Sequence, residues 1–130
     1  MNLMIVEDEA AIREGVSEFL RSQGYYVWEA ADGQEALDLF GEVSVDLVLL
    51  DIMMPKKNGF EVLAEIRKSS TVPVLMLTAV ADEEAQIKTF DLLVDGYIQK
   101  PFSLALLAKR IEALLKRHYG EFDIWEYKDS

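Results

Sequence analysis

Polar residues able to do chemistry stand at four distant points of the chain, each at the end of a short apolar run. They are the acidic triplet Glu7-Asp8-Glu9, Asp51, Thr78 and Lys100. Neither histidine nor cysteine accompanies them, because the chain lacks cysteine and its one histidine is His118. A metal bound by these residues would therefore have oxygen ligands only. Such ligands suit Mg²⁺, which keeps several waters and commonly bridges to phosphate.

The residue types favour phosphoryl transfer to a carboxylate. The carboxylates of Glu7, Asp8 and Asp51 would repel one another unless a cation lay among them. Lys100 offers a point charge for a phosphoryl oxygen, and Thr78 offers a hydroxyl. Metal, lysine and hydroxyl together stabilise a transferring phosphoryl group, and a carboxylate can accept it. Taken singly, an Asp after a strand is more often a helix N-cap and a Lys before Pro is usually a surface residue, so the hypothesis depends on their joint placement.

The elements that must position these residues alternate along the chain. Short apolar runs cover residues 3–6, 25–28, 47–50, 74–77 and 97–99, and helical patterns lie between and after them. Nearly continuous runs of Val, Leu, Ile and Met are typical of strands buried on both faces of a parallel sheet. Asp32 and Asn58 are the expected N-caps of the second and third helices. This βαβαβαβαβα order predicts a doubly wound α/β fold.

The strand order follows from where the polar residues fall. The second run ends in Glu29-Ala30-Ala31 and offers no obvious chemistry beyond Glu29, which favours an edge position for that strand. The predicted order is therefore 2-1-3-4-5. In such sheets, ligands bind beyond the carboxyl ends of the strands, where the strand order reverses. That crevice, between the first and third strands, would gather Glu7, Asp8 and Asp51.

Composition limits the possible functions. The 130 residues suit one domain, and a formal net charge of −11 would repel a phosphate backbone, so DNA binding by this chain itself is not expected. No apolar run is long enough to cross a membrane and no signal peptide is recognisable, which favours a cytoplasmic protein. Residues 119–130 read differently, with a strand-like alternation after Gly120. They are expected to be a linker or the start of an output domain, although an ordinary C-terminal extension fits equally well.

Together these segments resemble the receiver (CheY-like) domains of bacterial two-component response regulators, over about residues 2–118. The resemblance is to the OmpR/PhoB-type subfamily and implies a flavodoxin-like (βα)5 fold. The matching pieces are Ile5-Val6-Glu7-Asp8-Glu9, Asp46-Leu47-Val48-Leu49-Leu50-Asp51, Met54-Pro55, Asn58-Gly59, Leu77-Thr78-Ala79 and Tyr97-Ile98-Gln99-Lys100-Pro101-Phe102.

The resemblance implies a role for each residue of the cluster. Asp51 would accept a phosphoryl group from a phosphohistidine of a sensor histidine kinase. Asp8, Asp51 and the backbone carbonyl of Met53 would bind Mg²⁺, with support from Glu7. Lys100 would pair with the phosphoryl group. Such a domain is a phosphoacceptor switch, not a classical enzyme, and it assists its own phosphotransfer and dephosphorylation.

The resemblance also implies how the signal leaves the site. Thr78 would turn its hydroxyl toward the phosphoryl group and Tyr97 would swing inward, altering the face formed by the fourth helix, fifth strand and fifth helix. A homodimer would form through this face, and DNA would be bound only by an output domain outside this chain. The Lys100–Pro101 peptide bond would be cis. The expected interface residues are Ile87, Phe90, Leu106 and Arg110.

Two departures from the family pattern concern this interface. An acidic residue usual at position 96 is replaced by glycine, so Arg110 lacks an expected partner. A basic residue usual near Gln86 and an acidic one usual near Leu106 are also missing, which puts the ordinary dimer ion pairs in doubt.

Other functions fit less well. A haloacid-dehalogenase-type phosphatase would need a second Asp two residues after the nucleophile, where Met53 stands. A dinucleotide-binding domain would need a glycine-rich loop after the first strand. A receiver-like interaction module that works without phosphorylation is the better alternative, but the set of site residues is complete.

Overall fold

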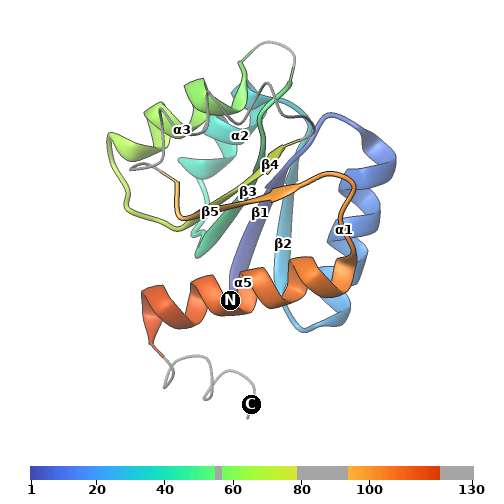
Figure 1. Ribbon diagram of the computed structural model, residues 1–130. Coiled ribbons are helices and arrows are strands. Elements are labelled where there is room, and N and C mark those ends of the chain that lie inside the picture. Colours follow the sequence, from blue (N-terminus) through green and yellow to red (C-terminus); the bar gives the residue numbers. More distant parts are fainter. Residues whose placement is uncertain (55–56, 79–93, 121–130) are drawn as a thin grey trace.

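The computed structural model describes residues 1–54, 57–78 and 94–120, and shows the predicted doubly wound α/β architecture. Five parallel strands form one sheet in the order β2-β1-β3-β4-β5, as expected (Figure 1). The predicted fourth helix, with Ile87 and Phe90, lies outside the described residues. The elements are β1 (Asn2–Val6), α1 (Ala10–Ser22), β2 (Tyr26–Ala30), α2 (Gly33–Phe40), β3 (Leu47–Asp51), α3 (Gly59–Arg67), β4 (Val74–Thr78), β5 (Gly96–Gln99) and α5 (Leu104–Tyr119).

The sheet lies between two helical layers. Helices α2 and α3 cover one face, and α1 and α5 cover the other (Figure 1). Alternate residues of the central strands point into each layer: Met4 and Val48 face α2 and α3, whereas Ile5 and Leu49 face α1 and α5. All residues of β3 and β4 are buried, which explains why their sequences are nearly continuous apolar runs.

The helices that border the site begin at defined caps. Asp32 accepts a hydrogen bond from the Glu35 N–H at 2.8 Å and starts α2. Asn58 starts α3 through a reciprocal capping box with Glu61. Both caps confirm the sequence prediction. By contrast, Glu9 precedes α1 without a side-chain cap hydrogen bond, so the start of α1 depends on other contacts.

Strand β2 occupies one edge of the sheet, as predicted, and its outer side is partly covered from α1. Arg21 donates from Nη2 to the Val27 carbonyl at 2.8 Å and to Glu29 Oε2 at 3.1 Å. A free strand edge can template pairing with another chain, and a charged side chain bonded to that edge opposes it. Two aromatic residues of β2 itself reach solvent: Tyr26 is 74% exposed and Trp28 is 38% exposed.

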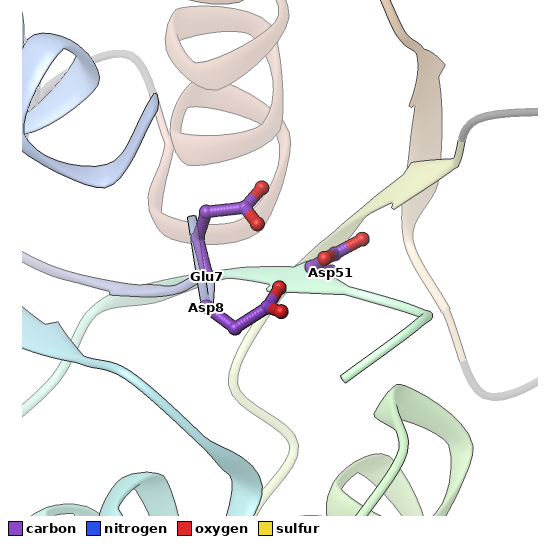
Figure 2. Close-up of side chains that lie close together, drawn as sticks. All are labelled: Glu7, Asp8 and Asp51. Atoms are coloured by element: carbon purple, nitrogen blue, oxygen red, sulfur yellow. The ribbon is translucent and has the colours of Figure 1, made fainter. Parts of the chain in front are cut away.

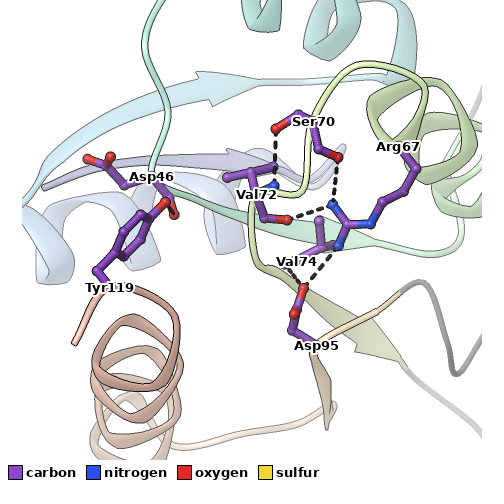
Figure 3. A network of polar contacts seen from close by, with 7 residues as sticks. All are labelled: Asp46, Arg67, Ser70, Val72, Val74, Asp95 and Tyr119. Carbon is purple, nitrogen blue, oxygen red and sulfur yellow. Dashed lines mark hydrogen bonds and ion pairs between the residues drawn. The ribbon is translucent and has the colours of Figure 1, made fainter.

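Polar contacts at the amino ends of the strands join distant segments (Figure 3). Arg67, at the end of α3, donates to the Val72 carbonyl at 2.6 Å and pairs with Asp95 at 3.0 Å, and Asp95 accepts from the Val74 N–H at 2.8 Å. Tyr119 donates its hydroxyl to the Asp46 carbonyl at 2.7 Å. These contacts fix the start of β5 and the end of α5 against the sheet.

Among the residues that the structure describes, no helix combines the length and the apolar character needed to span a membrane.

Candidate metal centre

Three carboxylates meet beyond the carboxyl ends of β1 and β3 (Figure 2). Glu7 and Asp8 follow β1 directly, and Asp51 is the last residue of β3. Each residue offers one carboxylate oxygen, and the three oxygens lie within 4.8 Å of one another. The adjacent strands β1 and β3 bring together residues 44 positions apart, because Val6 pairs with Leu50 in the sheet. The predicted convergence of Glu7, Asp8 and Asp51 is therefore present.

Lys100 lies against this cluster from the end of β5. Its Nζ is 2.6 Å from Glu7 Oε1 and 3.5 Å from Asp51 Oδ1. Glu7 is fully buried, and its other carboxylate oxygen accepts the Glu9 N–H at 3.2 Å. The lysine therefore neutralises Glu7 more closely than Asp51. The sequence predicted Lys100 in the site but not this preference.

Burial and neighbouring charge oppose ionisation of Asp51. Burial, and after it the nearby Glu7 charge, raise the pKa of the Asp51 carboxyl to about 7, although Lys100 acts in the opposite direction. Burial acts to lower the pKa of Lys100, but its hydrogen bond to Glu7 and the charge of Asp51 raise the pKa overall. The pocket therefore holds more negative charge than one lysine offsets.

Glycine at position 59 lets α3 approach the backbone of Asp51. A Cβ atom there would lie 2.5 Å from the Asp51 carbonyl oxygen and 2.8 Å from Ile52 Cα. Neither contact is possible without displacement, because both neighbours are backbone atoms. The Gly59 N–H donates to the Ile52 carbonyl at 2.8 Å. This close approach fixes the carboxyl end of β3, from which Asp51 projects.

Thr78 and Lys100 lie on the neighbouring strand ends. Thr78, the last residue of β4, is 3% exposed. The Lys100 N–H donates to the Thr78 carbonyl at 2.6 Å, which ties the two residues together. The Lys100–Pro101 peptide bond is cis, as predicted.

The remaining predicted residues are Met53, expected to contribute only its backbone carbonyl, and the residues expected at the output face. The side chains of Met53 and Tyr97 are 62% and 43% exposed. Leu106 is 42% exposed, and Arg110 donates to the Tyr97 carbonyl at 3.4 Å, so both lie with Tyr97 beside β5. Ile87 and Phe90 are outside the described residues. The structure thus places Tyr97, Leu106 and Arg110 on one face, apart from the carboxylates.

Sequence analysis missed two residues at the rim of the site. Arg13 of α1 donates from Nη1 to the Glu7 carbonyl at 2.8 Å, and its Nε lies 3.5 Å from Glu29 Oε1. Glu29 was noted at the end of its strand but was given no role. A usable signal was present: an arginine one turn after an acidic strand end, together with an acidic residue at the end of the adjacent strand.

The donor set fits a hard divalent cation. Three carboxylate residues converge, one of them fully buried and one exposed, with only Lys100 as a cationic partner in direct contact among the described residues. Mg²⁺ is typically bound by one or two carboxylates and retains waters, so an exposed carboxylate at the mouth of the cluster suits it. Glu7, Asp8 and Asp51 are the side chains that would hold it.

Comparison with known proteins gives a consistent result. The family model described as "Response regulator receiver domain" matches residues 3–112. Response regulator RR06 of Streptococcus pneumoniae is 50% identical over 129 residues, covering 99% of this chain and 59% of the relative. The probable transcriptional regulator ycf27 of Guillardia theta is 49% identical over 115 residues, covering 88% and 45% respectively. The chain therefore spans about half the length of these curated relatives.

Solved structures share the fold. The receiver domain of the Francisella response regulator 1452 superposes with a TM-score of 0.81 at 31% identity, covering 89% of this chain and 97% of that one. The Vibrio cholerae chemotaxis protein CheY4 superposes with a TM-score of 0.80 at 32% identity, covering 87% and 97%. In both, the match extends over nearly the whole of the other chain.

Proposed function

This chain belongs to the receiver-domain family of response regulators, and from that membership we propose that it is a signalling switch phosphorylated on Asp51. The donor is a phosphohistidine of a sensor histidine kinase. An Asp51 carboxylate oxygen attacks phosphorus and forms the new O–P bond, while the P–N bond breaks and its electron pair returns to the histidine ring. The product is an aspartyl phosphate.

The neighbouring residues support this transfer in distinct ways. Glu7, Asp8, Asp51 and the Met53 carbonyl would hold Mg²⁺, which would supply positive charge to offset the phosphoryl oxygens. Lys100 lies 3.5 Å from Asp51 Oδ1, close enough to pair with a phosphoryl group formed there. Charge neutralisation by fixed groups is the main way proteins accelerate phosphoryl transfer. The same groups assist loss of the phosphoryl group to water.

A surface suited to the kinase lies next to Lys100. A mainly apolar groove of about 550 Å³ runs between α1 and the segment after β5, lined by Ala11, Ile12, Gly15, Pro101 and Phe102 among others. A helix that carries the phosphohistidine can occupy such a groove through its apolar face. Its position brings a bound histidine toward Asp51.

The output of the switch is a change at the face formed by the predicted fourth helix, β5 and α5. Thr78 and Tyr97 couple this face to the phosphoryl group, and Ile87, Phe90, Leu106 and Arg110 form a homodimer interface there. Curated relatives include proteins named as transcriptional regulators, which supports an OmpR/PhoB-type regulator in which residues 1–118 are the receiver. Residues 119–130 are then a linker or the start of a DNA-binding output domain, and the protein acts in the cytoplasm.

One observation carries the proposal: a nucleophilic carboxylate, two further carboxylates and a lysine converge at the switch point of the sheet. The test is phosphorylation of the 130-residue chain by acetyl phosphate with Mg²⁺, followed by intact mass spectrometry. We expect the wild type and Asp38→Asn, a change on the exposed side of α2, to gain one phosphoryl group. Asp51→Asn should gain none and keep its fold by circular dichroism.

The same experiment separates this proposal from its alternative. A receiver-like module that binds partners without phosphorylation would show no mass change in the wild type. Stoichiometric uptake by Asp51→Asn would place the acceptor elsewhere.

A further inference from the structure

The turn that carries Glu7 and Asp8 has one internal hydrogen bond among the described contacts, from the Glu9 N–H to Glu7 Oε2 at 3.2 Å. Helix α1 begins after Glu9 without a side-chain cap hydrogen bond. The Asp8 side chain, for its part, makes no hydrogen bond or ion pair with any residue in the described part of the chain. The direction of the Asp8 carboxylate therefore depends on how the backbone of residues 7–9 is held.

Two contacts hold the backbone at Glu7. The Glu7 N–H donates to the Ala30 carbonyl of β2 at 3.0 Å, as a continuation of the sheet. The Glu7 carbonyl accepts from Arg13 Nη1 at 2.8 Å. Because Asp8 follows this carbonyl directly, the Arg13 bond fixes the peptide plane that joins the two metal-facing residues.

Arg13 is itself held in place from β2. Its Nε lies 3.5 Å from Glu29 Oε1, and its side chain is only 18% exposed. The other oxygen of Glu29 pairs with Arg21 at 3.1 Å. Glu29 is thus fixed between two arginines of α1, and only Arg13 reaches the carboxylate cluster.

From this arrangement we infer that Arg13 is a positioning residue for the carboxylate cluster, oriented by Glu29 and acting through the Glu7 carbonyl. Its part in Mg²⁺ binding rests on the proposed function. The arrangement resembles outer partners of metal ligands in general, whose removal typically weakens metal affinity by about 10- to 100-fold although they never touch the metal.

The direction in which the Mg²⁺ affinity changes distinguishes a positioning role from a purely electrostatic one. Arg13→Met removes a positive charge near a cation site, so through-space electrostatics alone would tighten Mg²⁺ binding. A positioning role predicts weaker binding. Arg21→Met is the matched control, because it removes the same charge from the same helix and breaks a bond to the same Glu29, but does not touch the Glu7 carbonyl.

Titration of the 130-residue chain with MgCl2 by calorimetry tests this prediction. We expect Arg13→Met to raise the Mg²⁺ Kd by about 10-fold and Arg21→Met to change it by less than about 2-fold. Absence of Mg²⁺ binding by the folded wild type would overturn the proposed function and this inference together. Wild-type binding that Arg13→Met leaves unchanged or tightens would overturn the inference alone.

Hydrogen exchange in the absence of metal tests whether Arg13 holds the backbone of residues 7–9. In EDTA, hydrogen exchange at the Glu7 and Glu9 amides, which donate to the Ala30 carbonyl and to Glu7 Oε2, should be about 10-fold faster in Arg13→Met than in Arg21→Met, because only the former frees the turn. Should Arg13→Met fail to fold, the nearly isosteric Glu29→Gln replaces it, and faster exchange at these two amides is again expected. Unchanged exchange in the folded variant would overturn the inference.

Discussion

At the scale of single residues, the site is a set of charges that do not balance. Asp51 is buried beside a second buried carboxylate, and Lys100 is bonded mainly to the latter, Glu7. Buried carboxylates of like charge favour protonation of one of them. Burial first, and the Glu7 charge second, raise the pKa of Asp51 to about 7. Under the proposed function, a bound cation or a more alkaline pH would make the Asp51 carboxylate fully available as a nucleophile.

This imbalance predicts a pH-dependent stability in the metal-free protein. The pKa of Asp51 is raised to about 7 in the folded state, so the folded state binds more protons than the unfolded state between the ordinary carboxyl pKa and 7. The contribution of Asp51 to the unfolding free energy is therefore fully present at low pH and is lost as the pH rises through 7. In EDTA, the unfolding free energy of the wild type should fall between about pH 5 and about pH 8. For Asp51→Asn this fall should be smaller than for the wild type by about 1 kcal/mol or more, as measured by urea unfolding. Equal falls would contradict this assignment.

A second residue-scale prediction concerns Lys100. Because its ammonium lies 2.6 Å from Glu7, it would compete with the proposed Mg²⁺ for the same carboxylate. Lys100→Met should therefore tighten Mg²⁺ binding by about 10-fold, as expected when a charge at this range is removed. It should slow phosphorylation by acetyl phosphate nonetheless. Lys68→Met, which breaks an exposed pair with Glu65, is the control and should change neither quantity. Weaker Mg²⁺ binding by Lys100→Met would show that the lysine organises the site.

At the scale of elements, the sequence predicted what depends on local pattern. Strands β3 and β4 were recognisable because both faces are buried, and Asn58 was recognisable as a cap from its spacing to Glu61. The second strand was placed at residues 25–28 but lies at Tyr26–Ala30, since exposed aromatics there resemble core positions. The Arg13–Glu29 and Arg67–Asp95 pairs were not predicted. They join residues whose proximity depends on how elements pack, which local spacing does not reveal.

At this scale, replacing either of two glycines with alanine should change the stability of the protein, in opposite directions for the two positions. Gly15 lies in the middle of α1, and a Cβ there would meet no heavy atom within 4 Å. Gly15→Ala should therefore stabilise the protein by about 0.5–1 kcal/mol, because glycine loses more backbone entropy in a helix. Gly59→Ala should destabilise it, since the added Cβ would meet Asp51 backbone at 2.5 Å. Urea unfolding measures both, and a stabilising Gly59→Ala would refute the close approach.

At the scale of the whole molecule, association should depend on apolar contact. Tyr97 and Leu106 are exposed beside β5, whereas Gly96 leaves Arg110 without the acidic partner usual in the family. Apolar burial contributes about 25 cal/mol per Å², while an exposed ion pair contributes about 0–1 kcal/mol. We expect the phosphorylated chain to dimerise with mild salt sensitivity. Sedimentation over a range of NaCl tests this, and a monomer at every salt concentration, or complete dissociation by high salt, would contradict it.

The contact between Tyr119 and Asp46 has a geometric consequence. Asp46 precedes β3 and its N–H donates to the Asn2 carbonyl, so the end of α5 is tied to the amino ends of the strands. The carboxylates lie at the opposite ends, about 17 Å away for strands of five residues. The end of α5 therefore lies at the end of the sheet opposite the carboxylate cluster. Under the proposed function, an output domain following Gly120 would be joined at the end of the sheet opposite Asp51, so phosphorylation would have to act on it through the side of the molecule and not by direct contact.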